Sequence, residues 1–97
     1  MLNSRQRAQL RGMANGMETI FQVGKGGIAP QLIKQVDEAL EARELIKCRC
    51  LETSPLSSKE AANEIAAQVG ADVVQVIGSR FVLYRVSENN KQIVLVK

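Results

Sequence analysis

The hydrophobic and polar positions of the 97-residue chain alternate between helical and strand spacing. Near the N-terminus, hydrophobic residues recur three or four positions apart, which predicts an amphipathic helix with Ser4 as its N-cap. The residues of that hydrophobic face are Leu10, Met13, Ala14 and Met17. The whole pattern predicts seven elements, in the order helix, strand, helix, strand, helix, strand, strand. Their expected ranges are 4–15, 19–23, 30–43, 45–51, 57–70, 73–77 and 80–86.

Local start and stop signals support the two later helices. Pro30 suits the first position of a helix, although Ala29 before it has no side chain that can cap one. Ser57 and Glu60 form a capping box, and Gly70 ends the helix that they begin. The inner face of this helix consists mainly of small residues, so we expect it to pack closely against a sheet.

The last two predicted strands are joined by Gly78-Ser79, which suits a type II′ hairpin turn. Such a turn places Asp72 opposite Arg85, where we expect a cross-strand ion pair. The other expected pairs are Val76 with Phe81, Val74 with Leu83, Gln75 with Val82 and Val73 with Tyr84. The first two of these pairs should face the core, with Tyr84 on the outer face. Residues 93–96 fit either a further edge strand or a packed tail.

This order of elements predicts an α/β (α+β) two-layer sandwich. Right-handed crossovers make the first part of the sheet parallel, and the final hairpin adds antiparallel strands. We therefore expect a mixed four-stranded sheet with the helices packed mainly on one face. Neither a linker nor a repeat interrupts the chain, so residues 1–97 are interpreted as a single domain.

Composition argues against most enzyme classes. The chain has 45% hydrophobic and 24% charged residues, which is typical of a compact globule, and it contains no histidine. Cys48 and Cys50 leave the same face of a strand, so we expect buried reduced thiols without a disulfide or a metal site. We also expect no cofactor and no small-molecule substrate. No apolar run is long enough to span a membrane, and the start of the chain lacks a signal-peptide pattern, which favours the cytoplasm.

Charge is segregated along the chain, although the net charge is only +3. Residues 1–36 contain five lysines and arginines against one acid, whereas residues 37–72 contain eight acids against four basic residues. Residues 73–97 are again basic. This distribution is expected if one surface binds a polyanion while another faces water.

Gly24-Lys25-Gly26-Gly27 lies between a predicted strand and a predicted helix, a position that favours an anion. A nucleoside triphosphate is excluded, because no serine or threonine follows Lys25 to bind magnesium. Gly24, Gly26 and Ala29 fit a relaxed dinucleotide fingerprint, but the chain is too short for two nucleotide-binding halves. The third alternative is a nucleic-acid backbone held by a Gly-x-x-Gly loop of the KH kind.

The chain has too few aromatic residues for the classes of nucleic-acid-binding protein that recognise bases by stacking. Phe21, Phe81 and Tyr84 are the only three, and Phe81 is expected in the core, so no platform can stack successive bases. We therefore expect recognition of folded RNA through its backbone and shape, with strong dependence on salt.

Three segments resemble one known family. Gly24-Lys25-Gly26-Gly27-Ile28, then Glu44-Leu45-Ile46-Lys47-Cys48-Arg49, and finally Val74-Gln75-Val76-Ile77-Gly78 with Val82-Leu83-Tyr84-Arg85 are similar to the chloroplast RNA splicing and ribosome maturation (CRM) domain. The stand-alone bacterial members of that family are YhbY-like proteins. The resemblance implies a fold similar to the C-terminal domain of translation initiation factor 3. It also implies binding to ribosomal RNA in precursors of the large subunit.

Carried onto this chain, the resemblance implies that residues 24–27 clamp phosphates and that Lys25 is the cation of the clamp. We expect a flanking basic surface formed by Arg5, Arg7, Arg11 and Lys34. The prediction is a monomeric, non-enzymatic RNA-binding protein that assists assembly of the large ribosomal subunit. The alternative is a protein-interaction module on the ribosome that uses the acidic middle segment or the outer face of the sheet.

Overall fold

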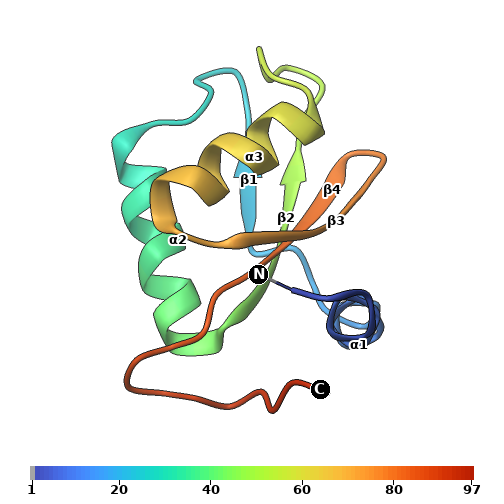
Figure 1. Ribbon diagram of the computed structural model, residues 1–97. Helices are drawn as coiled ribbons and strands as arrows, with labels where there is room; N and C mark the ends of the chain where they lie inside the picture. Colours follow the sequence, from blue (N-terminus) through green and yellow to red (C-terminus); the bar gives the residue numbers. More distant parts are fainter. Residues whose placement is uncertain (1) are drawn as a thin grey trace.

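The computed structural model describes residues 2–97 as three helices and a four-stranded sheet (Figure 1). The helices are α1 (Ser4–Ala14), α2 (Pro30–Arg43) and α3 (Ser58–Val69), and the strands are β1 (Phe21–Val23), β2 (Leu45–Cys50), β3 (Asp72–Ile77) and β4 (Arg80–Tyr84). The strands lie in the order β1-β2-β4-β3, with β1 parallel to β2 and the other neighbours antiparallel. The element order and the mixed sheet predicted from the sequence are confirmed.

Helices α2 and α3 cover one face of the sheet and form the main core (Figure 1). The alternate residues Ile46, Cys48 and Cys50 of β2 point into this core, together with Phe81 and Leu83 of β4. Every residue of the predicted small face of α3 is buried, which lets the helix approach the strands closely. The capping box at its start and the left-handed Gly70 at its end are also as predicted.

Helix α1 lies on the opposite face of the sheet, over a smaller second core (Figure 1). Leu10 and Ala14 are its buried residues, and they pack over the outer faces of β2, β3 and β4. Two details of the sequence prediction were wrong here. The N-cap is Asn3, which forms a capping box with Gln6, and Met13 is 45% exposed instead of packed on the sheet.

The β3–β4 hairpin has the predicted turn, but the predicted register holds only near it. Gly78 has the positive φ that a type II′ turn requires, and Gln75 pairs with Val82 as expected. A register shift between Val73 and Gln75 then moves Val74 to the α1 side of the sheet. The predicted pairing of Val74 with Leu83 was therefore wrong, because a β-bulge reverses which side chains face the core.

The bulge also removes the expected partner of Arg85. Asp72 pairs with Tyr84 in the sheet, and the Arg85 guanidinium instead binds the Asp37 carboxylate on α2, at 2.5 Å. The same guanidinium donates to the Val69 carbonyl at the end of α3, so Arg85 joins both helices to the end of β4. Tyr84, expected on an accessible outer face, is buried under α1 and the C-terminal tail.

Residues 87–97 form a packed tail without strand structure, which decides between the two alternatives left open for this segment. The buried carboxylate of Glu44 accepts hydrogen bonds from the amides of Ser87, Gln92 and Ile93, at 2.7–2.8 Å. Burial alone would raise the pKa of Glu44, but these three amides and the charge of Lys91 outweigh it, so the pKa is lowered.

Glu41, one turn earlier on α2, holds the first turn of the same tail. Its carboxylate accepts from the Ser87 hydroxyl at 2.8 Å and from the amides of Glu88 and Asn89. Further along, the side chains of Gln6 and Gln9 on α1 bond to backbone groups at Val94 and Val96. The tail is therefore attached to α2 at one end and to α1 at the other.

We expect Glu44→Gln to reduce the free energy of unfolding at pH 7 by about 2 kcal/mol, because a buried charged acceptor of three backbone amides is lost. In the folded protein the pKa of Glu44 lies below its usual value, so the carboxylate stabilises the wild-type fold at every pH above that usual pKa. This contribution is lost as the pH falls toward the folded pKa, and the variant should show a smaller loss over the same range. Urea unfolding at several pH values measures both effects. Glu38→Gln, at an exposed position of the same helix, is the control and should behave like wild type.

Candidate nucleic-acid interface

The glycine loop, residues 24–27, begins where β1 ends. The Val23 carbonyl accepts the Leu51 amide at 2.8 Å, which is the last bond between the β1 and β2 segments. The chain then reverses in a tight turn, in which the Gly27 amide donates to the Gly24 carbonyl at 2.9 Å. Lys25 and Gly26 are exposed at the tip of this turn.

The glycines of the loop have different physical roles. Gly27 has a φ of 68°, and a Cβ there would lie 3.4 Å from Cγ of Pro55 in the loop between β2 and α3. Gly24 is close to the Leu51 side chain, whereas a Cβ on Gly26 would have no neighbour within 4 Å. Gly27 is therefore required by the turn itself, and Gly26 leaves open space at the tip.

The backbone amides around this turn are only partly available to an anion. The resemblance implied that residues 24–27 together clamp phosphates, but the amide of Gly27 already closes the turn and is not available for this role. Within residues 2–97, the amides of Lys25 and Gly26 have no hydrogen-bond acceptor. In the first turn of α2, Pro30 has no N–H, and the amides of Gln31 and Leu32 are unpaired because Ala29 provides no side-chain cap, as the sequence predicted.

The structure brings together only part of the predicted basic surface. Lys34 is exposed in the second turn of α2, about 6 Å along the helix axis from its first residue, so it lies beside the loop. The arginines of α1 do not flank the loop, because α1 and residues 24–29 lie at opposite ends of the molecule (Figure 1). Arg7 is also engaged with the Val73 carbonyl, and Arg5 lies 3.5 Å from the Lys97 carbonyl. Arg11 is half-buried in the last turn of α1.

Three cations on the sheet were not among the predicted site residues. Lys47, Arg49 and Arg80 all point to the α1 side of the sheet, and Arg49 and Arg80 are exposed there. Lys47 and Arg49 alternate with Ile46, Cys48 and Cys50 along the sequence, a pattern that by itself predicts one largely basic face of this strand. Local spacing does not predict that Arg80 joins this face. Its position depends on the register of β2 with β4, which places Arg80 directly opposite Arg49.

The two cysteines belong to the main core between the sheet and its two covering helices. Cys48 and Cys50 are free and buried, as predicted, and burial raises the pKa of Cys48 to about 12. Cys50 donates to the Leu56 carbonyl at 3.2 Å. Within residues 2–97, no group of three potential ligands is placed to hold a metal ion. Over the same range, no helix combines the length and the apolar character needed to cross a bilayer.

Comparison with known proteins identifies the family of the chain. Residues 2–85 match the model of the CRS1/YhbY (CRM) domain. The chain belongs to this family. The resemblance seen in the sequence is therefore confirmed, and it extends over nearly the whole chain.

Several relatives that match over most of their length are named for RNA binding. Probable RNA-binding protein YqeI of Bacillus subtilis is 44% identical over 95 residues, covering 98% of this chain and 99% of the relative. An RNA-binding protein of Haemophilus influenzae is 30% identical over 90 residues, with 93% and 91% covered. The solution structure of SAV1595 from Staphylococcus aureus superposes with a TM-score of 0.82 at 45% identity, covering 99% and 100% of the two chains.

We expect Gly27→Ala to lower the free energy of unfolding by about 1 kcal/mol, because alanine is strained at this φ and its Cβ contacts Pro55. Gly26→Ala, at the open tip, should change it by less than about 0.5 kcal/mol. Chemical unfolding of both variants measures the difference. Equal effects at the two glycines would contradict their assigned roles.

Proposed function

We propose that this CRM protein binds structured RNA through the glycine loop and the adjoining start of α2. The observation that carries the proposal is the exposed turn at Lys25 and Gly26, whose amides are unpaired within the described residues. A phosphate can approach this turn closely because Gly26 has no side chain and no close neighbour.

The start of α2 adds a favourable field to the same place. The unpaired amides of Gln31 and Leu32 and the positive end of the helix dipole attract an anion, and no acidic residue lies in the first turn. Lys25 and Lys34 are the exposed cations on either side. Together these groups suit a sugar-phosphate backbone, which presents several anions in succession.

The RNA that we propose is ribosomal RNA in precursors of the large subunit, with the protein acting as a monomeric assembly factor. Two observations support this choice. Relatives that match over nearly their whole length are named RNA-binding proteins. The two phenylalanines and the tyrosine are buried or half-buried, so the protein is suited to folded RNA read by shape, and large ribosomal RNA offers such surfaces.

Gly26→Asp should weaken binding to a large-subunit ribosomal RNA fragment by at least about tenfold, because it places a carboxylate where a phosphate would lie. The fold should be unaffected, since the position has an ordinary φ and open space. Gln68→Glu is the control, because it adds the same charge at an exposed position of α3. Fluorescence anisotropy at several salt concentrations measures affinity. If Gly26→Asp and Gln68→Glu bind equally well, the loop is not the contact.

Two variants on α2, Lys34→Gln and Arg43→Gln, test whether Lys34 beside the loop contributes to binding. Lys34→Gln should weaken binding about threefold to tenfold and reduce the salt slope by about one. Arg43→Gln makes a similar charge change at the other end of the helix, away from the loop, and should leave both quantities unchanged.

Crosslinking in cell extract, followed by sequencing of the attached RNA, tests the proposed partner. We expect large-subunit ribosomal RNA to be enriched and the protein to sediment with immature large-subunit particles. Gly26→Asp should lose both signals. Sedimentation with mature subunits alone, or crosslinks distributed over unrelated RNAs, would disprove the assembly role while leaving RNA binding itself intact.

A further inference from the structure

One row of side chains crosses the part of the sheet that α1 leaves uncovered. Gln22, Arg49, Arg80 and Ile77 are partners in register across β1, β2, β4 and β3, and all four are exposed. We call these four residues the sheet row. At about 4.8 Å between neighbouring strands, the row is about 14 Å long.

The sheet row carries a charge arrangement that folding does not explain. Arg49 and Arg80 lie directly opposite each other on antiparallel strands, where like charges destabilise the sheet. Their neighbours in the row, Gln22 and Ile77, are uncharged. Among the described residues the one salt bridge is that of Arg85 with Asp37, so neither arginine of the row has an acidic partner. Two neighbouring guanidinium groups without an acidic partner favour the binding of an external anion.

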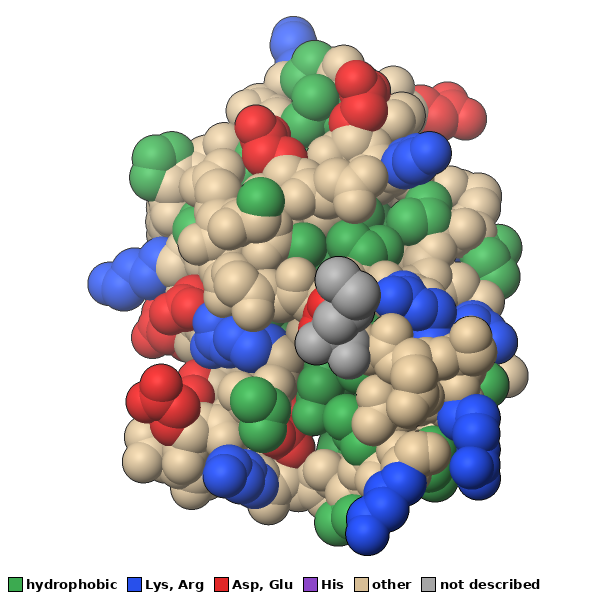
Figure 2. Space-filling view, in the orientation of Figure 1, with side chains coloured by type: hydrophobic (Ala, Val, Ile, Leu, Met, Phe, Trp, Pro, Cys, Tyr) green, Lys and Arg blue, Asp and Glu red, His purple; other side chains and the backbone are tan. Residues whose placement is uncertain are grey.

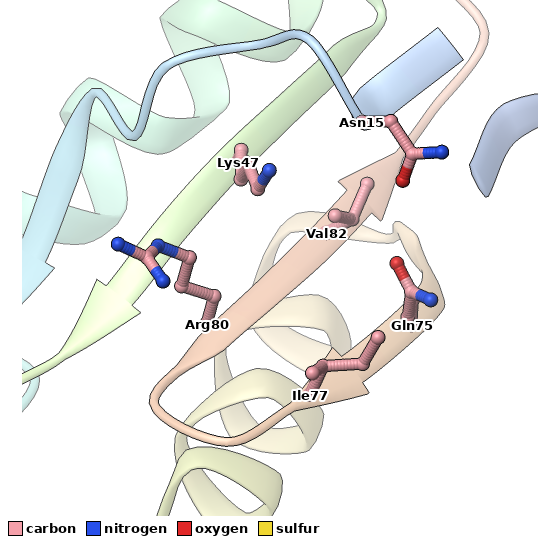
Figure 3. A pocket seen from close by; sticks show the side chains of 6 residues that line it. All are labelled: Asn15, Lys47, Gln75, Ile77, Arg80 and Val82. Carbon is pink, nitrogen blue, oxygen red and sulfur yellow. The ribbon is translucent and has the colours of Figure 1, made fainter. Parts of the chain in front are cut away.

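Next to the row lies a hollow of about 190 Å³ (Figure 3). Its lining combines cations, side-chain amides and apolar groups from three strands and the end of α1: Asn15, Lys47, Gln75, Ile77, Arg80 and Val82. The Lys47 ammonium also donates to the Ala14 carbonyl at 3.1 Å, which holds it at the edge of the hollow. In the space-filling view, lysine and arginine side chains gather at the lower right, on the side of the molecule where α1 lies (Figure 2).

This lining matches an unpaired nucleotide better than the backbone of a duplex. A duplex presents mainly phosphates, and these would leave the 62%-exposed Ile77 and the two amides without a role. A base that is not paired has an apolar face and a hydrogen-bonding edge. Ile77 can contact the face, and Asn15 and Gln75 can bond the edge. The guanidinium of Arg80 can stack on the base or bind its phosphate.

We propose that the sheet row and the hollow form a second RNA contact, which takes an unpaired nucleotide next to the folded RNA held by the glycine loop. This inference rests on the proposed function and extends it. Gln22 is two residues before Gly24, so the β1 end of the row lies about 7 Å from the loop. One RNA can therefore reach both contacts, with paired structure at the loop and an unpaired extension across the sheet.

The test uses the full-length protein and two RNA probes, a blunt hairpin and the same hairpin with a short unpaired extension. Wild type should bind the extended hairpin more tightly. Arg80→Gln and Arg49→Gln should each lose about fivefold to tenfold on the extended hairpin and less than about twofold on the blunt one. Their thermal unfolding should be unchanged or improved, because a like-charge pair is relieved. Arg43→Gln, at an exposed position on α2, is the control for the charge change.

Ile77→Ser separates contact with a base from contact with phosphates. It should weaken binding of the extended hairpin without altering the salt slope, since no charge is changed. Equal losses on both probes for the arginine variants would overturn the assignment to an unpaired nucleotide. No loss on either probe would overturn the second contact altogether and favour a protein partner for this face. Gly26→Asp distinguishes the glycine-loop proposal from the sheet-row proposal. It should weaken the binding of both RNA probes even if the sheet row has no role.

Discussion

The parallel pairing of β1 with β2 is the constraint on which both candidate RNA contacts depend. Two parallel neighbours require a crossover, and α2 makes it on one face of the sheet. The crossover begins at the end of β1, so the glycine loop and the first turn of α2 meet at one edge of the molecule. The same pairing places Gln22 beside Arg49, so the exposed row on the other face begins next to the loop.

The C-terminal tail shows how this small sheet keeps both faces covered. Helices α2 and α3 shield one face, but α1 alone is too short to cover the other. Ile93 and Leu95 of the tail pack into the second core beside α1. The tail has no strand partner, and the carboxylates of Glu41 and Glu44 bind its amides instead. Neither α1 nor the tail covers the sheet row, so its arginines are exposed to solvent.

Much of this architecture could be predicted because the signals are local. Helical spacing, the capping box at Ser57, Pro30 at a helix start and the two-residue turn at Gly78 each depend on neighbours within a few positions. The weak cap at Ala29 was visible for the same reason. β1 is shorter than predicted because only Phe21–Val23 has a register partner in β2, and pairing depends on that distant strand.

The sequence alone therefore determined the order of the elements, the mixed sheet and the loop that joins β1 to α2. Only the tertiary structure decided the bulge at Val74, the ion pair of Arg85 with Asp37 and the burial of Glu44 under the tail. It also separated the arginines of α1 from the glycine loop and placed Arg80 beside Arg49. The physical reason is that each of these outcomes depends on which distant residues meet across strands and layers, and no local spacing encodes that choice.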